Sequence, residues 1–395
     1  MNLKIFTDNI EEKALTQIHN LLAQPAFADC KVRIMPDVHA GKGCVIGFTA
    51  DLGDKVIPNV VGVDIGCGML TCDLGNVWID LEKLDEVIRE KIPFGMNVHE
   101  QAPAVFEELD DLLCIESLKN MSWLQNSLGT LGGGNHFIEV DVGNDNRKYL
   151  VIHTGSRNLG KQVADYYQSV AIERINGGKA DLNKKINQLI SDYKARGREK
   201  EIAGAIMELR AGYAVTEKMP NELCYLTGED RQHYLHDMGI CQRFAVRNRA
   251  MIAETICQEM GWESNRFETI HNYIDLESNI IRKGAISAKK GERVLIPINM
   301  RDGCIIGIGK GNEDWNCSAP HGAGRVMPRM QAKRTVSMNA YRESMYGIFS
   351  TSVTEDTLDE CPMAYKPMEE ILKNIEPTVE VEQIIKPVYN FKAGE

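Results

Sequence analysis

The sequence predicts a single large α+β domain with a mostly β centre and a helical insertion. Runs rich in β-branched residues occur in both the N-terminal and the C-terminal part of the chain, which indicates strands there. Helical apolar spacing dominates between them, at about residues 159–262, which indicates the insertion. No internal repeat, low-complexity tract or clear linker interrupts the chain. We therefore expect one domain over residues 1–395.

Apolar periodicity and flanking turn residues predict the individual elements in chain order. The expected helices outside the insertion are Asn9–Leu22, Leu81–Lys91, Ala104–Ser117, Pro328–Tyr346 and Met368–Asn374. The expected strands are Cys30–Met35, Val56–Val63, Asn135–Val140, Tyr149–His153, Phe267–His271, Arg293–Asn299, Cys304–Ile308 and Val379–Phe391.

Composition limits the classes of protein to which the chain can belong. Hydrophobic residues make up 43% and charged residues 26%, as in ordinary globular proteins. The net charge of -11 gives no global attraction to nucleic acid, so an RNA partner needs a local basic patch. The eleven cysteines form no Cys-x-x-Cys pair, which argues against a disulfide framework and for a reducing compartment. No apolar run is long enough to span a bilayer, and the first residues lack the apolar core of a signal peptide, so we expect a cytoplasmic protein without a membrane partner.

The segment Ser318–Arg325 places a histidine between a proline and two glycines. Gly322 and Gly324 permit backbone angles and close approaches that a β-carbon forbids. The ring of His321 is neutral for much of the time near pH 7, so it can serve as a nucleophile or a ligand, and the planar fork of Arg325 suits a phosphate. A surface turn with an ordinary histidine is the alternative.

Five residues next to turns carry side chains that bind metals: Asp64, Cys67, His136, His153 and His271. Asp64 and Cys67 share one loop, and the three histidines stand at strand ends beside Asn or Thr. Any one of these histidines alone is more often structural, but their joint placement favours a site for Zn, Mn, Fe or Co. His233 and His236, three residues apart on an expected helix, are interpreted as surface residues.

Taken together, these segments resemble the RtcB family of RNA ligases. The resemblance covers most of the chain in the family's order. The matching stretches are Met35–His39 with Gly41–Gly43, Val63–Met69, Gly132–Glu139, His153–Arg157, His271–Tyr273 and His321–Arg325.

The resemblance implies an RNA ligase that uses GTP and Mn2+. Such an enzyme joins an RNA end bearing a 3′-phosphate or 2′,3′-cyclic phosphate to a 5′-hydroxyl end, after hydrolytic opening of the cyclic phosphate. His321 is the implied nucleophile, which carries GMP as a phosphoramidate before GMP passes to the RNA 3′-phosphate. The implied ligands of two ions are Asp64, Cys67, His136, His153 and His271, with Cys67 between the ions. Zinc would outcompete manganese at such ligands by intrinsic affinity, so manganese follows from the resemblance alone.

The resemblance also implies contacts to the nucleotide and to RNA. Glu139 can accept hydrogen bonds from the N1 and N2 edge of guanine, and Arg157 and Lys42 are the candidates for RNA phosphate. Asp37 is a candidate for acting on the 5′-hydroxyl. The implied nucleotide-binding residues are Asn135, His136, Phe137, Ile138, Glu139, His271, Asn272, Pro297, Ile298, Asn299, Met300, Cys304, His321, Gly322, Ala323, Gly324, Tyr365 and Lys392.

The sequence departs from the family's pattern at Ile298–Asn299, where the family has Gly-Ser, and at Cys304, where it has serine. These departures motivate an alternative function, a metal-dependent phosphodiesterase or cyclic phosphatase that acts on RNA ends without ligation. A non-catalytic RNA-binding protein is a third class, but binding alone needs no nucleophile. The sequence indicates neither the natural RNA, the oligomeric state nor an accessory protein.

Overall fold

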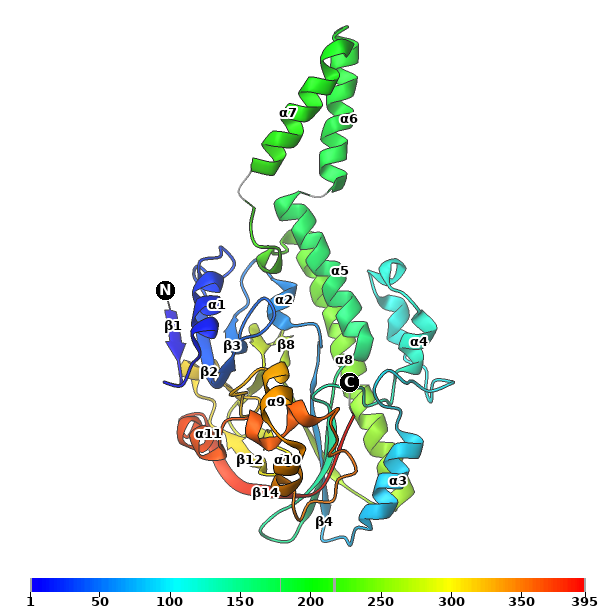
Figure 1. Cartoon of the computed structure of the whole chain (residues 1–395), viewed down its shortest axis with the longest axis vertical. Helices are drawn as coiled ribbons and strands as arrows, with labels where there is room; N and C mark the ends of the chain where they lie inside the picture. Colours follow the sequence, from blue (N-terminus) through cyan, green and yellow to red (C-terminus); the bar gives the residue numbers. More distant parts are fainter. Residues whose placement is uncertain (1, 178, 216–217, 394–395) are drawn as a thin grey trace.

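The computed structural model describes residues 2–177, 179–215 and 218–393. Two large β-sheets and a two-stranded sheet lie in the body, and a pair of helices projects from it (Figure 1). The larger sheet has the strand order β11-β12-β14-β5-β6-β4-β7. Its strands are β4 (Gly68–Gly75), β5 (Phe137–Val142), β6 (Lys148–Thr154), β7 (Asn265–Ile270), β11 (Arg293–Asn299), β12 (Gly303–Gly309) and β14 (Val379–Lys392).

Side chains alternate between the two faces of this sheet, because successive residues of a strand point in opposite directions. On β5, Ile138 and Val140 pack against the apolar faces of the helices α3 (Leu81–Lys91) and α8 (Gly228–Met260). Phe137, Glu139 and Asp141 therefore point to the opposite face. This second face carries the candidate site.

The larger sheet curls until its two edge strands meet. β11 contacts β7, and the guanidinium of Arg293 lies 4.5 Å from the ring centroid of Phe267. A buried cluster that includes Met69, Val151 and Leu295 fills the interior of the curl. The sheet is thus nearly closed, which confirms the expected α+β class with a β centre.

The smaller sheet has five strands in the order β1-β2-β3-β9-β8. A two-stranded sheet of β10 and β13 connects it to the site. The bounds are β1 (Asn2–Ile5), β2 (Lys31–His39), β3 (Ile46–Asp51), β8 (Asn272–Asp275), β9 (Ile280–Lys283), β10 (Ala285–Ser287) and β13 (Ser318–Pro320). β2 is longer than the expected Cys30–Met35, because its pairing with β3 breaks after Ile34 and resumes at His39.

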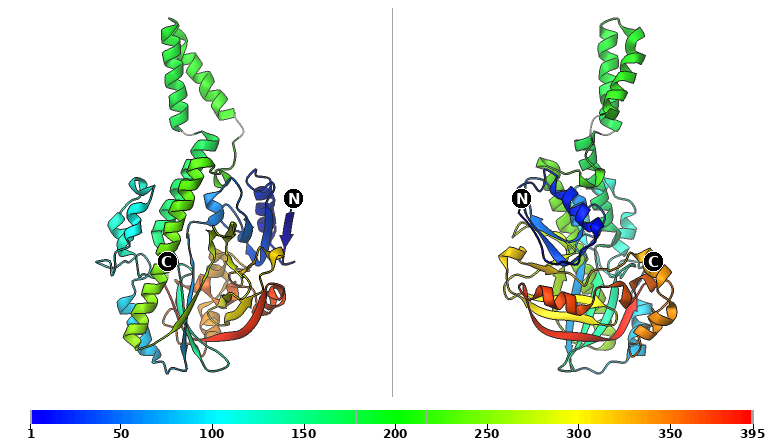
Figure 2. Two further views of the ribbon diagram at one scale, coloured as in Figure 1. Left: turned by 180° about the vertical axis from the view of Figure 1, so that it is seen from behind. Right: turned by 60° about the vertical axis from the view of Figure 1, so that its left-hand side comes forward.

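Four long helices occupy much of the chain between Arg157 and Met260: α5 (Arg157–Asn176), α6 (Lys179–Ala195), α7 (Ile202–Val215) and α8. α5 and α8 lie side by side on the body, and α6 and α7 form the projecting pair (Figure 2). Hydrogen bonds from Asn176, which we call the clasp, connect the chain just before α6 to the chain after α7. The Asn176 amide donates to the Met219 carbonyl at 2.8 Å and to the Asn221 side chain at 3.0 Å.

The expected strand Val56–Val63 is wrong. This segment contains the short helix α2 (Pro58–Val61), and only Val56 forms a β-bridge, to Leu226. Pro58 opens the helix, where its missing N–H costs nothing, and all four helical residues are buried. A short apolar run of this kind fits either a buried strand or a buried helix, so periodicity cannot distinguish them.

The expected helix Pro328–Tyr346 is two helices, α9 (Arg329–Thr335) and α10 (Met338–Ser344). The break lies at Ser337, whose side chain caps α10 by accepting from the Ala340 backbone N–H. The remaining helices are α1 (Glu12–Leu22), α4 (Met121–Asn126) and α11 (Met368–Ile375).

The expected helix Ala104–Ser117 is also wrong, because the segment is irregular apart from two 3-10 turns, Glu107–Asp111 and Ile115–Ser117. The fully buried carboxylate of Asp237 on α8 accepts from the backbone N–H groups of Leu113 and Cys114, at 2.9 and 3.0 Å. It also accepts from the Tyr167 hydroxyl at 2.8 Å. A distant side chain thus satisfies the backbone groups that a helix would have paired.

All eleven cysteines are free thiols, which agrees with the expected absence of a disulfide framework. Among the described residues, no helix is both long and apolar enough to cross a membrane.

We predict that Asp237→Ala lowers the free energy of unfolding by roughly 2–4 kcal/mol, because two buried N–H groups and a buried hydroxyl lose their acceptor. Urea unfolding measures the change. Asp165→Ala, which removes an exposed ion pair with Lys161 on α5, is the control and should change stability by less than about 0.5 kcal/mol. Equal losses in both variants would contradict the role of Asp237.

Candidate metal centre and nucleophile

Four adjacent strand ends bring the predicted metal ligands together. Gly68 on β4 pairs with Thr154 on β6 and with Ile270 on β7, so Cys67 and His271 lie just beyond the pairing and His153 lies within it. His153 also pairs with Phe137, the residue after His136.

The donor atoms of Cys67, His136 and His153 lie within 4.8 Å of one another. The Cys67 Sγ atom is 3.6 Å from His136 Nε2 and 3.2 Å from His153 Nε2. An Asp64 carboxylate oxygen is 3.0 Å from His136 Nε2. Gly155 permits this packing, because a β-carbon there would lie 2.1 Å from Asp64 Oδ1.

Backbone carbonyls orient two of the imidazoles. His136 Nδ1 lies 2.9 Å from the Leu131 carbonyl, and His153 Nδ1 lies 3.1 Å from the Asn135 carbonyl. A carbonyl can only accept, so each Nδ1 carries a proton, and the Nε2 lone pair of the neutral His153 ring faces Cys67. This is the tautomer that a metal-binding histidine requires. His136 Nε2 faces the Asp64 carboxylate as well, so a proton or a cation must lie between these two acceptors.

The donor set fits a divalent cation. Asp64 Oδ1 and His271 Nδ1 are buried without a hydrogen-bond partner. Burial lowers the pKa of His153 and of His271 well below the usual value, which keeps both rings neutral. Burial and the Asp64 carboxylate raise the pKa of the Cys67 thiol, so a cation is needed to stabilise its thiolate.

His321 stands next to this cluster, and Asp37 holds its ring. His321 Nδ1 is 2.6 Å from Asp37 Oδ2, and the His321 backbone N–H donates to the same oxygen. Asp37 is fully buried. The hydrogen bond places the proton on Nδ1 and leaves the lone pair on Nε2, as a nucleophilic histidine requires. Gly324, at a φ of 77°, allows this approach, since a β-carbon would lie 2.3 Å from the Asp37 carbonyl oxygen.

Four histidine rings form a continuous row from the metal ligands to His321. The ring centroids of His136 and His153 are 5.3 Å apart, those of His153 and His271 5.2 Å, and those of His271 and His321 4.8 Å. The candidate nucleophile is thus in contact with the candidate metal centre.

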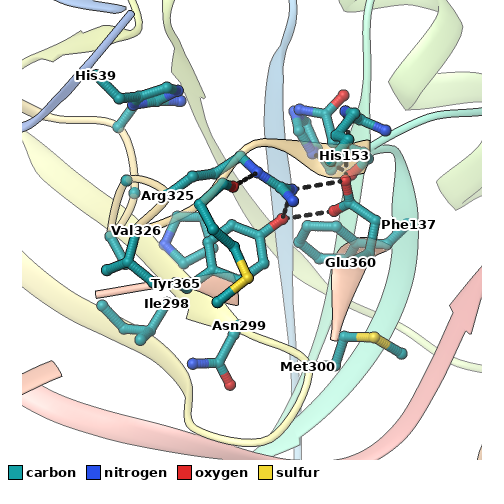
Figure 3. Close-up of a pocket in the computed structure, with 18 of the residues that line it drawn as sticks. His39, Phe137, His153, Ile298, Asn299, Met300, Arg325, Val326, Glu360 and Tyr365 are labelled. Carbon is teal, nitrogen blue, oxygen red and sulfur yellow. Dashed lines mark hydrogen bonds and ion pairs between the residues drawn. The ribbon is translucent and has the colours of Figure 1, made fainter. Parts of the chain in front are cut away.

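A cavity of about 440 Å³ opens beside His321 (Figure 3). Its lining includes fourteen of the predicted site residues: Asn135, Phe137, Glu139, His153, Pro297, Ile298, Asn299, Met300, His321, Gly322, Ala323, Gly324, Tyr365 and Lys392. The lining does not include His136, Ile138, His271, Asn272 or Cys304. Ile138 points to the opposite face of the sheet, into the core beneath α8.

Comparison with known proteins shows the family of this chain. The family profile described as tRNA-splicing ligase RtcB matches residues 17–122 and 115–393. The chain belongs to the RtcB family. It is 27% identical to the RNA-splicing ligase RtcB of Escherichia coli K12, over 96% of this chain and 94% of that protein. It is 26% identical to the tRNA-splicing ligase RtcB of Aeropyrum pernix, over 91% and 87% of the two chains.

Glu360, which was not predicted from the sequence, binds several of the polar side chains that line the cavity of this RtcB-family chain. Its buried carboxylate accepts from Lys392 Nζ at 2.7 Å and from the Tyr365 hydroxyl at 2.5 Å. Arg325 pairs with its other oxygen at 3.2 Å (Figure 3). Arg329 pairs with the same oxygen at 3.0 Å. Glu360 lies in the 3-10 turn Leu358–Glu360, and no motif distinguishes it from the other acidic residues.

Arg325 was predicted as a phosphate ligand, but its guanidinium binds groups of the protein itself. Besides Glu360, it donates to the backbone carbonyl oxygens of Asp359 and Met327, at 2.6 and 3.1 Å. Asp37, the candidate for acting on the 5′-hydroxyl, is hydrogen-bonded to the ring and the backbone N–H of His321.

The two predicted RNA-binding residues lie outside the cavity lining. Arg157 begins α5 in the left-handed region, at a φ of 57°, and donates to Thr130 Oγ1 and the Gly95 carbonyl at 3.0 and 3.1 Å. It is close enough to Asp64 and Cys67 to interact with them electrostatically. The exposed Lys42 lies in the loop before β3, and its carbonyl accepts from Lys283.

The positions that depart from the family's pattern are engaged in local contacts. Asn299 closes the turn between β11 and β12, where its oxygen accepts from the backbone N–H groups of Arg301 and Asp302. Its amide donates to Asp302 Oδ2 at 2.8 Å. Cys304 is fully buried beneath the cavity, with its thiol 3.7 Å from Glu139 Oε1.

We predict that Glu360→Gln lowers stability by roughly 3 kcal/mol at neutral pH. Burial opposes ionisation of Glu360, but Lys392 and Arg329 outweigh it and lower the pKa to about 2. The pKa of Glu360 is lower in the folded state than in the unfolded state, where it is near 4.5. Ionised Glu360 therefore stabilises the folded protein at pH values above about 4.5. This contribution is lost as the pH falls from about 4.5 toward 2.

Urea unfolding of both proteins at several pH values between about 3 and 7 tests this prediction. The stability difference should be constant above about pH 5 and should shrink below it. The exposed Glu369→Gln is the matched control. A difference that does not change with pH would contradict an ionised Glu360.

Proposed function

We propose that this chain is a GTP- and Mn2+-dependent RNA ligase that acts through a guanylyl-histidine intermediate. It joins an RNA end with a 3′-phosphate or 2′,3′-cyclic phosphate to a 5′-hydroxyl end, in RNA repair or tRNA splicing. One observation carries the proposal. His321 lines a nucleotide-sized cavity, next to the cluster of candidate metal ligands, and its Nδ1 atom is hydrogen-bonded to Asp37.

In the proposed reaction, His321 Nε2 attacks the α-phosphorus of GTP. A P–N bond forms, the bond to the β-phosphate oxygen breaks, and pyrophosphate leaves. Asp37 stabilises the positive charge that the ring develops. The RNA 3′-phosphate then takes GMP from His321, and the 5′-hydroxyl finally displaces GMP to form the new phosphodiester.

Asp64, Cys67, His136, His153 and His271 would hold the two manganese ions. When bound, these ions supply positive charge to the triphosphate and to the attacking and leaving oxygens of an in-line displacement. The chain's own contribution is to aim the Nε2 atoms of His136 and His153 toward Cys67, through the carbonyls that fix the two rings.

The cavity supports the nucleotide part of the proposal. Asn135, Phe137 and Glu139, on or just before β5, line the cavity together with Gly322, Ala323 and Gly324, which follow β13. The Glu139 carboxylate would select guanine through its N1–H and N2–H groups. Tyr365 and Lys392 line the same cavity, held by Glu360.

The RNA partner would approach the metal centre from the side of Arg157 and Lys42, since the overall charge is acidic and only local cations attract phosphate.

We also propose that residues 1–395 act as one domain with a helical insertion at about 159–262. A cytoplasmic location, indicated by the cysteine content, belongs to the same proposal.

We predict that His321→Ala abolishes covalent labelling, because the variant lacks the imidazole that forms the P–N bond. The purified protein is incubated with manganese and GTP labelled at the α-phosphate, then analysed by denaturing electrophoresis. The label should be acid-labile and base-stable. His233→Ala, at a half-exposed histidine on α8, is the control and should keep the label. A normal label in His321→Ala would exclude this nucleophile.

We predict that Cys67→Ala loses manganese-dependent guanylylation and joining, because the thiolate lies between two imidazole donors. Metal content after dialysis and joining of a 3′-phosphate RNA to a 5′-hydroxyl RNA measure the loss. Full activity in metal-stripped protein would contradict the metal centre. Absence of GTP labelling together with opening of a cyclic phosphate would instead favour the phosphodiesterase function.

A further inference from the structure

A second group of metal-binding side chains lies below the cavity and shares no residue with the cluster around Cys67. It consists of Glu139 and Asp141 on β5 and Cys304 on β12, which are at most 2% exposed. One donor atom from each lies within 4.8 Å of the others. β14 lies between these two strands, and there Asn390 is directly opposite Glu139.

Acceptors outnumber donors in this group. The Asn390 amide donates to Glu139 Oε2 at 2.5 Å, and the Cys304 thiol lies 3.7 Å from Glu139 Oε1. Both carboxylate oxygens of Asp141 and the side-chain oxygen of Asn390 are buried without a hydrogen-bond partner. Leaving such oxygens unpaired costs several kcal/mol, particularly for a carboxylate.

The two lysines that interact electrostatically with this group donate hydrogen bonds to other residues. Lys392 Nζ, which interacts with Glu139 electrostatically, donates to Glu360 at 2.7 Å. Lys386, which interacts with Asp141, donates to the Asp302 carbonyl at 3.1 Å on the exposed side of β14. The two carboxylates and the thiol of this group therefore face one another without a hydrogen bond from a lysine.

A proton shared between Glu139 and Asp141 would satisfy one oxygen on each. The Cys304 thiol can donate to the second oxygen of Asp141, but the Asn390 oxygen would still have no donor. One divalent cation can be coordinated by several of these oxygens at once. Because a thiol stands among the oxygens, the donor set suits zinc better than magnesium or calcium, which prefer oxygen ligands alone.

We propose that Glu139, Asp141 and Cys304 form a buried site for a divalent cation of the zinc class, with the Asn390 oxygen as a further donor. Binding releases the Cys304 thiol proton to solvent, so affinity rises with pH. The cation would keep Glu139 ionised and fix its carboxylate at the inner end of the cavity. The proposal rests on this donor set and not on the proposed ligase activity.

Cobalt(II) serves as the probe, because a thiolate bound to it absorbs in the near ultraviolet. The experiment uses Cys67→Ala protein, in which the centre beside His321 contributes no thiolate. We expect this protein to bind Co2+ with thiolate absorption, and the double variant Cys67→Ala/Cys304→Ser to lack that absorption. Cys67→Ala/Cys317→Ser, which removes a partly exposed cysteine, is the matched control and should retain it.

A second measurement keeps the test independent of absorption. Zn2+ should raise the melting temperature of Cys67→Ala protein and should raise it much less in Cys67→Ala/Asp141→Asn protein. Folded Cys67→Ala protein without thiolate absorption would overturn the proposal in favour of a carboxyl pair that shares a proton. Absorption that persists without Cys304 would also overturn it. GTP labelling of the wild type is a separate measurement, so failure of one proposal does not affect the other.

Discussion

The pairing register of β4, β5, β6 and β7 is the constraint on which the site depends. One predicted metal ligand lies on or next to the end of each strand. The hydrogen bonds between the strands fix the distances between these ends. A shift of one residue on β6 would turn His153 toward α8 and bring Ile152 to the site, because side chains alternate. The apolar packing of Ile138 and Val140 beneath α8 therefore stabilises the chemistry on the opposite face.

Much of the site could be predicted from the sequence, because its residues stand beside glycines and at the ends of β-branched runs. Cys67, His136, His153, His271 and His321 are all of this kind, and the fold brings them into one row of contacts. The roles of Asp37 and Arg325 could not be predicted in the same way. Whether a carboxylate or guanidinium faces a substrate or another side chain depends on distant partners, such as Glu360 for Arg325.

The helices and strands could also be predicted only in part. Long amphipathic segments such as α3 were predicted with the observed bounds, because their periodicity extends over several turns. Val56–Val63 and Ala104–Ser117 were wrong for tertiary reasons. In the first, a short apolar run accepts either conformation, and in the second, the buried Asp237 replaces the hydrogen bonds of a helix.

The clasp at Asn176 has a consequence for how this chain can change in length. The amide of Asn176 joins residues on both sides of the α6–α7 pair, so the pair leaves the body and returns to it at nearly one point. A segment whose ends already meet can be lengthened, exchanged or removed without altering the pairing of the strands beneath it. The projecting pair is thus a place where the protein can acquire or lose a module while the row of histidines stays in position.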